Sequence, residues 1–330
     1  MNSKRHLLVS AIVCCVAGCL SLPAAAQAYP TKPIRLVVPF GAGGVADLTA
    51  RTVVQKMAEG LGQSVVIDNK PGAGGVVAGD AVAKAAPDGY TLLLMSNGTA
   101  VSAGLFKSLP FDTAKDFAPV STLGFFDLSI VVADNSRFKT LGELLAYARA
   151  NPGKLNVGTI NVGSTQNLAA ELFKTSAGVD VQVVPFNGTP AVITALRGGQ
   201  IDAAVEILSP VVPQINARAL RALAVMGEKR SATLPDVPTV AESGLKGFNV
   251  ASWNAVAAPA KTPAAVVQRL NREIQAALKT PEVQKQLLAM HIEARGGSPE
   301  QLGQLLASET QRWGDVITRA NIPRQLLVRG

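Results

Sequence analysis

Short apolar runs alternate with amphipathic stretches along most of this chain. In the first third, the apolar runs predict β-strands, and the stretches with apolar residues on one helical face predict α-helices. The predicted order is strand Ile34–Val38, helix Val45–Leu61, strand Ser64–Ile67, helix Val76–Ala86 and strand Tyr90–Met95. This order predicts a parallel sheet with right-handed crossovers, in which ligands bind beyond the carboxyl ends of the strands.

The same alternation returns in the second third and predicts a second lobe. Its strands are expected at 128–133, 155–159, 181–185, 201–207 and 222–226, and its helices at 141–150, 168–176 and 191–197. After a connection rich in proline and glycine at 235–247, an extended segment at 250–257 precedes helices at 266–278, 281–290 and 299–320. We predict an α/β protein in which residues 29–127 and 250–330 form lobe 1 and residues 128–249 form lobe 2. Crossover segments near 122–130 and 248–257 would join the lobes.

The amino-terminal residues 1–28 have the pattern of a signal peptide. Lys4 and Arg5 precede the apolar run Leu7–Leu22, and small residues end the segment at Ala28. We predict export to the periplasm with cleavage after Ala28. Two alternatives stay open: a membrane anchor, and a lipoprotein cleaved before Cys19, which ends a lipobox-like sequence.

Cysteine, histidine and charge narrow the possible chemistry. All three cysteines lie in the leader, so thiol catalysis, cysteine-ligated metal and disulfides are not expected after cleavage. His291 is then the only histidine, which excludes a site with several histidine ligands. We expect no metal and no cofactor. The formal net charge of +8 is carried by scattered lysines and arginines, which does not favour nucleic-acid binding.

A glycine-rich turn occurs twice, each time between a predicted strand and a predicted helix. The first copy runs from Pro39 to Val45 and the second from Pro71 to Val76. Backbone N–H groups exposed at a helix N-terminus bind anions. We therefore predict a carboxylate or phosphate site. Its lobe 1 candidates, which include the polar residues after strand 90–95, are Phe40, Gly41, Ala42, Gly43, Gly44, Gly74, Ser96 and Asn97.

The first turn also satisfies a dinucleotide-binding fingerprint. Gly41 and Gly43 follow a strand and open a helix, and Asp68 ends the next strand. A Rossmann-type oxidoreductase is therefore the alternative function. Against it stand the export signal, the absence of residues suited to hydride chemistry, and the second glycine turn directly after Asp68.

Lobe 2 offers polar turns at equivalent positions. Its candidate residues are Ser164, Thr165, Gln166, Asn167, Phe186, Asn187 and Glu206. Ser164 to Asn167 either bind a ligand or only cap the following helix. Glu206 ends an apolar strand and either faces the cleft or caps a local group. If it faces the cleft, it repels a second ligand carboxylate unless it is protonated or accepts a hydrogen bond from the ligand.

Sequence motifs along nearly the whole chain after the leader resemble the Bug-type, TctC-like substrate-binding proteins of tripartite tricarboxylate transporters. The motifs that carry the resemblance are Tyr29-Pro30-Thr31-Lys32-Pro33-Ile34-Arg35, Val38-Pro39-Phe40 with Gly43-Gly44 and Asp47, Asn69 to Gly75, Ala86 to Leu92, Asp116 to Val120, Gly198 to Asp202, Leu220 to Val225 and Leu234 to Thr239.

The resemblance implies a two-lobed type II periplasmic binding protein fold, with mostly parallel sheets, that closes like a hinge on a small carboxylate. It implies a receptor without enzymatic activity, monomeric, that delivers its ligand to a multi-helix membrane permease or a sensor. It assigns Phe40, Gly41, Gly43, Gly44 and Asp47 to one side of the site and the turn at 164–167 to the other.

This chain departs from the family pattern at several positions of the site. Gly41 and Ala42 stand where two prolines are common, and Gln166 and Asn167 where a Ser-His pair is common. Phe186 replaces a tyrosine and Glu206 an aspartate. The identity of the ligand therefore cannot be carried over from the family.

Overall fold

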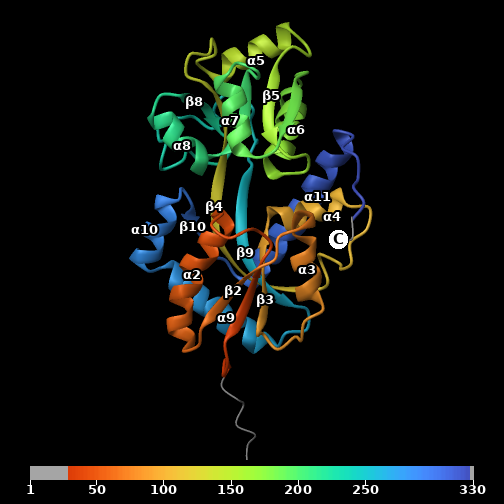
Figure 1. Ribbon diagram of the computed structural model, residues 1–330, viewed down its shortest axis with the longest axis vertical. Helices are drawn as coiled ribbons and strands as arrows, with labels where there is room; N and C mark the ends of the chain where they lie inside the picture. Colours follow the sequence, from red (N-terminus) through yellow and green to blue (C-terminus); the bar gives the residue numbers. More distant parts are fainter. Residues whose placement is uncertain (1–28, 328–330) are drawn as a thin grey trace, which may run out of the picture.

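The computed structural model describes residues 29–327. They form two lobes joined by two extended strands, β4 (Phe117–Ala133) and β9 (Ala251–Pro259), which pair antiparallel and run side by side (Figure 1). The predicted signal peptide, its cleavage after Ala28 and the lipoprotein alternative through Cys19 concern residues outside the described part of the chain. No helix among residues 29–327 combines the length and the apolar character needed to cross a membrane.

Lobe 1 is built on a sheet with the strand order β2-β1-β3-β9-β4. Strands β1 (Ile34–Val38), β2 (Val65–Asn69) and β3 (Thr91–Ser96) are parallel, and β9 is antiparallel to β3. Helices α2 (Val45–Leu61), α9 (Ala264–Leu278) and α10 (Pro281–Ala289) contribute to the core on one face of the sheet. Helices α3 (Val76–Ala83), α4 (Asn97–Leu105) and α11 (Pro299–Arg319) contribute to the core on the other face.

The alternation of apolar residues along β1 explains why both faces of this sheet are covered. Ile34, Leu36 and Val38 belong to the core beneath α2 and α9, while Val37 belongs to the core beneath α3 and α4. All four side chains are fully buried. The apolar run Leu36-Val37-Val38, with side chains buried on both faces, is typical of a strand packed on both faces.

Lobe 2 repeats the scheme with strands β5 (Asn156–Ile160), β6 (Gln182–Phe186) and β7 (Ala203–Ile207). β5 pairs parallel with both β6 and β7, and β4 pairs antiparallel with β7 and with β8 (Leu220–Val225). The helices of this lobe are α5 (Leu141–Ala150), α6 (Thr165–Ala177), α7 (Thr189–Arg197) and α8 (Leu208–Asn216).

Strand β4 carries the chain from one lobe into the other without interruption. Its residues from Phe117 to Asp127 pair with β9, whereas those from Leu128 onward pair with β7 and β8. The change of partner follows Asp127. The sequence predicted only the part from Leu128 as a strand, because Ala118-Pro119 and the glycine at 124 interrupt the apolar pattern.

Several elements differ from the sequence prediction. Helix α4 begins directly after Ser96, where a polar turn was predicted, and α6 begins at Thr165 rather than at Leu168. Helix α8 and the two-residue strand β10 (Glu293–Ala294) were not predicted. In α8, Pro210 and Pro213 lower the apparent helix propensity. Pro210 lies in the first turn, which tolerates proline, whereas Pro213 lies inside the helix.

Candidate functional site

The first glycine turn is held closed by the carboxylate of Asp47. Gly43 has a left-handed backbone conformation with φ +82°, and its N–H donates to Oδ2 of Asp47 at 2.8 Å. Arg51 Nε donates to the same oxygen at 2.8 Å, and Asn69 Nδ2 donates to Oδ1 at 2.8 Å. Asn69 also donates to the carbonyl oxygen of Phe40, at 3.0 Å. These bonds tie strand β2, the turn and the first two turns of α2 together.

Asp47 therefore supports the turn rather than pointing away from it. Its side chain is buried. Burial would raise the pKa of Asp47, but the hydrogen bonds from Arg51, Asn69 and Gly43 outweigh it and hold the pKa at about 2. The carboxylate is charged at any physiological pH, and Arg51 balances it. Phe40, in contrast, has an exposed side chain.

The second glycine turn packs against the first. A Cβ added to Gly75 would lie 3.3 Å from Cβ of Pro39, the residue that opens the first turn. A Cβ added to Gly74 would lie 3.5 Å from the ring of Phe106, and the carbonyl oxygen of Gly74 approaches Gly98 in α4. The second turn thus bridges the first turn and the beginning of α4.

Helix α4 begins with a capping box and connects lobe 1 to lobe 2. The Ser96 hydroxyl accepts a hydrogen bond from the N–H of Gly98. Asn97 is fully buried, and its Nδ2 donates to Oγ1 of Thr165 in lobe 2 at 3.0 Å. The Asn97 Oδ1 accepts from the indole N–H of Trp313 on α11 at 2.9 Å. Two of the predicted residues, from different lobes, are thereby brought together.

The polar turn of lobe 2 uses the same local geometry as the first glycine turn. Gly163 has φ +81°, and its N–H donates to Oδ1 of Asn167, four residues later, at 3.1 Å. Ser164 caps α6 by accepting from the N–H of Asn167. A Cβ on Gly163 would clash with Leu105 at the end of α4, so this turn packs directly on lobe 1. Asn167 therefore holds Gly163 through the same contact by which Asp47 holds Gly43.

Glu206 ends strand β7 between the first turns of α6 and α7. Its Oε2 accepts from the hydroxyl of Thr189 at 2.9 Å and from Gln166 Nε2 at a longer 3.5 Å. Its Oε1 is buried and has no hydrogen-bond partner among residues 29–327. Burial raises the pKa of Glu206 to about 7, although the bonds from Thr189, Gln166 and the backbone of Ile207 act in the opposite direction.

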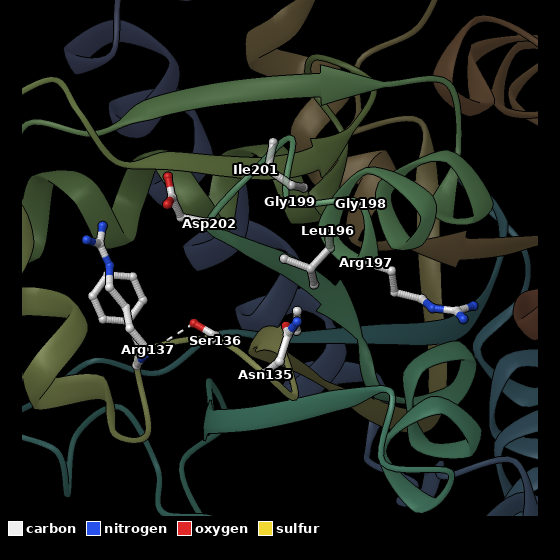
Figure 2. Close-up of a pocket in the computed structure, with 11 residues that line it drawn as sticks. Asn135, Ser136, Arg137, Leu196, Arg197, Gly198, Gly199, Ile201 and Asp202 are labelled. Atoms are coloured by element: carbon white, nitrogen blue, oxygen red, sulfur yellow. Dashed lines mark hydrogen bonds between the residues drawn. The ribbon is translucent and has the colours of Figure 1, made fainter.

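Phe186 and Asn187 lie apart from these contacts. The ring of Phe186 packs over Gly158, where an added Cβ would lie 3.4 Å from it, and Asn187 is exposed. A separate cavity of about 320 Å³ lies at the amino end of β7, whereas Glu206 is at its carboxyl end (Figure 2). It contains none of the predicted site residues; Figure 2 shows Arg137 and Arg197 on opposite sides of it.

Sequence reasoning missed five residues that shape the site: Asn69, Thr189, Glu309, Trp313 and Asn254. Two of them could have been identified from their positions. Asn69 is the last residue of β2, and Thr189 is the first residue of α7. Asn254 pairs with Ser96 across β3 and β9, and its Oδ1 is buried without a partner in the described structure. A polar residue inside the apolar run of β9 was a usable signal. Trp313 and Glu309, which bond to each other at 2.7 Å, gave no such signal.

Three parallel strands in each lobe end at one edge, and each is followed there by a helix N-terminus, either directly or after a turn. The contacts of Asn97 with Thr165 and of Gly163 with Leu105 place these two edges against each other. A pair of such lobes joined by long extended strands is the architecture of two-lobed solute-binding receptors, and this chain has it. Residues 49–322 match the profile of the "Tripartite tricarboxylate transporter family receptor". The chain belongs to this family.

Individual relatives agree with this assignment. Protein BugT of Bordetella pertussis is 36% identical over 319 residues, which cover 96% of this chain and 98% of that protein. The structure of the periplasmic binding protein BugD has 32% identity and a TM-score of 0.75, and the match covers 90% of this chain and 100% of that chain. An R. palustris protein solved with adipate has 35% identity and a TM-score of 0.77, and the match covers 89% of this chain and 98% of that chain.

The Rossmann alternative finds no support. The carboxylate of Asp68, the acidic residue of that fingerprint, lies 3.5 Å from Arg35 and 3.7 Å from Lys70. The second glycine turn occupies the space beside the first. The relatives are binding proteins, and their family is one of receptors.

Proposed function

We propose that this chain binds a small carboxylate-bearing metabolite between its lobes in the periplasm and closes on it like a hinge. The observation that carries the proposal is a set of helix N-termini at the facing edges that lack side-chain caps. Helices α2, α7 and α8 start after Gly44, Gly188 and Ile207, and none of these has a capping side-chain hydrogen bond within the described structure. Their first N–H groups and the positive ends of their dipoles favour an anion.

The glycine turn at 40–44 is the proposed carboxylate cradle. Asp47 holds the turn in shape through Gly43 and Asn69, so little backbone entropy is lost when a ligand binds. The negative charge of Asp47 is balanced by Arg51, at 2.8 Å, and therefore does not repel the ligand strongly. The chemistry agrees with the adipate bound to the R. palustris relative.

The remaining assignments of this proposal follow from the family and the sequence. Residues 29–127 with 250–330 would move as one lobe and residues 128–249 as the other, with β4 and β9 as the hinge. The protein would have no catalytic activity. It would act as a monomer after cleavage behind Ala28 and deliver its ligand to a membrane permease or sensor.

The test measures thermal stabilisation and calorimetric binding of the purified protein with mono-, di- and tricarboxylates, and with NAD⁺ and NADP⁺. A ligand at 100 times its Kd adds about 2.7 kcal/mol to the stability. We expect at least one carboxylate and neither dinucleotide to do so. Stabilisation by a dinucleotide alone would contradict the proposal.

Two matched variants test the cradle itself. Gly43 and Gly62 both have positive φ, +82° and +68°, and an added Cβ at either position meets nothing within 4 Å. Gly43→Val and Gly62→Val therefore impose similar backbone strain at the two ends of α2. We expect only Gly43→Val to abolish carboxylate binding. Equal affinities for both variants would exclude the turn as the cradle.

A further inference from the structure

Glu206 is a buried carboxyl group that the hydrogen bonds of the described structure satisfy only in part. Its side chain is 0% exposed, so water does not compensate for a missing hydrogen bond. Thr189 and Gln166 donate hydrogen bonds to Oε2, but Oε1 has no partner within residues 29–327. A buried carboxylate oxygen without a donor costs free energy in the ligand-free protein.

No charged side chain in the described structure forms an ion pair with Glu206. The groups that act on it are neutral: the Thr189 hydroxyl, the Gln166 amide and the backbone of Ile207. The elements around it, β4, β5, α6, α7 and α8, contribute no cation to it. This burial without a counter-ion is the reason that its pKa is raised to about 7. The described residues offer no cation and no further donor for Oε1, which a donor group of a ligand could provide.

The position of Glu206 places it at the facing edges of the lobes. Gln166, its partner at 3.5 Å, is the neighbour in sequence of Thr165, which bonds to Asn97 of lobe 1. Thr189 opens α7, one of the helices without a side-chain cap. The carboxyl end of β7 and the N-termini of α6 and α7 thus surround the same side chain.

We propose that Glu206 Oε1 accepts a hydrogen bond from a hydroxyl or ammonium group of the ligand, so that the receptor selects hydroxy- or amino-substituted carboxylates over unsubstituted ones. This inference rests on the proposed carboxylate function. The ligand's carboxylate is held by backbone N–H groups, and its donor group satisfies Oε1 of Glu206, which residues 29–327 leave unpaired. A site with an unpaired buried acceptor rejects an analogue that lacks the donor, because the acceptor then stays unsatisfied.

The experiment compares matched acids that differ by one substituent. The series are propionate, lactate and alanine; succinate, malate and aspartate; glutarate, 2-hydroxyglutarate and glutamate; and phenylpropionate, phenyllactate and phenylalanine. Binding to the purified protein is measured by calorimetry at about pH 8, where Glu206 is largely ionised. In the series that binds, we expect the hydroxy or amino acid to bind at least about tenfold tighter than the unsubstituted acid.

The Glu206→Gln variant tests the residue. It keeps the shape and removes the charge, and it should reduce this ratio at least about fivefold while leaving the unsubstituted acid within about twofold. Glu171→Gln, which removes a half-buried carboxylate from α6, is the control and should leave the ratio unchanged. Equal binding of substituted and unsubstituted acids, or an unchanged ratio in Glu206→Gln, would overturn the inference but leave the receptor function intact. If none of these acids and no member of the carboxylate panel binds, the inference about Glu206 and the proposed carboxylate function are both refuted.

A pH series gives an independent readout. If Glu206 accepts the hydrogen bond, affinity for the substituted acid increases as the pH rises through about 7, and this increase disappears in Glu206→Gln. Affinity that instead decreases over this range, only in the wild type, would show that protonated Glu206 donates to a second ligand carboxylate. That result would overturn the proposed selectivity.

Discussion

The stability of the ligand-free protein should depend on pH through Glu206. Its pKa is about 7 in the folded protein, because of burial, and near 4.5 when unperturbed. The folded state therefore holds the proton more tightly than the unfolded state. This contribution to stability is fully present below about pH 4.5 and is lost as the pH rises to about 7. Glu206→Gln removes the titrating group with little change in shape.

The size of the effect follows from the two pKa values. One pH unit between them corresponds to about 1.4 kcal/mol, so the difference between 4.5 and about 7 amounts to at most about 3.5 kcal/mol. Below about pH 4.5 the wild type carries a neutral carboxylic acid, and the variant a neutral amide, at this position. We therefore expect the variant to become more stable relative to the wild type as the pH increases, by up to about 3.5 kcal/mol at about pH 8.

The assay is reversible urea unfolding of both proteins without ligand, at several pH values from about 4.5 to about 8. The quantity of interest is the difference in unfolding free energy between the two proteins at each pH. Asp127 also titrates in this range: burial and the nearby Glu293 raise its pKa to about 6, although Arg295 acts in the opposite direction. It titrates in both proteins, so its contribution cancels in this difference. A difference that stays constant with pH would refute the reasoning, because Glu206 would then ionise as it does in the unfolded chain.

Two further substitutions test the supports of the site. Asp47→Ala should lower the free energy of unfolding in urea at neutral pH by about 2 to 3 kcal/mol, because Gly43, Arg51 and Asn69 all lose their buried acceptor. The ion pair contributes little to this loss, since Arg51 is half-exposed. A loss below about 0.5 kcal/mol would contradict the role of Asp47 as a support of the turn. Thr165→Val removes the acceptor of the buried Asn97 Nδ2. It should cost about 1 to 2 kcal/mol and increase the radius of gyration of the ligand-free protein in solution scattering. Thr194→Val, which removes only an exposed hydroxyl of lobe 2, is the control for the second variant, and identical scattering of the two would argue against the link between the lobes.

The sequence predicted the bounds of those helices that have recognisable residues at both ends. Helix α2 begins and ends at the predicted residues, Val45 and Leu61, since Gly62 ends it in a left-handed conformation. Helix α5 also matches at both ends, because Thr140 and Glu143 form a capping box at its start and Asn151-Pro152-Gly153 follows its last residue. Helix α4 was missed because the same polar signal, Ser96 with Thr99, was interpreted as a turn.

The roles within the site were less predictable than its residue types. The sequence indicated an acidic residue in the first turn of α2 and polar residues at the start of α6. It did not indicate that Asp47 and Asn167 would each bond to the N–H of the glycine four residues earlier. That contact requires a left-handed glycine and a fixed side-chain rotamer, which only the folded turn provides.

The sequence by itself determined the repeated strand, turn and helix units, the two glycine turns and the family motifs, because these depend on residues close together in the chain. Only the tertiary structure decided which turns face each other and which polar groups lose contact with water. Asn97 meets Thr165 across 68 positions and Trp313 across 216, and Glu206 meets Gln166 across 40. Burial of Glu206 results from the packing of several helices and strands around it, so no local pattern encodes its unpaired oxygen.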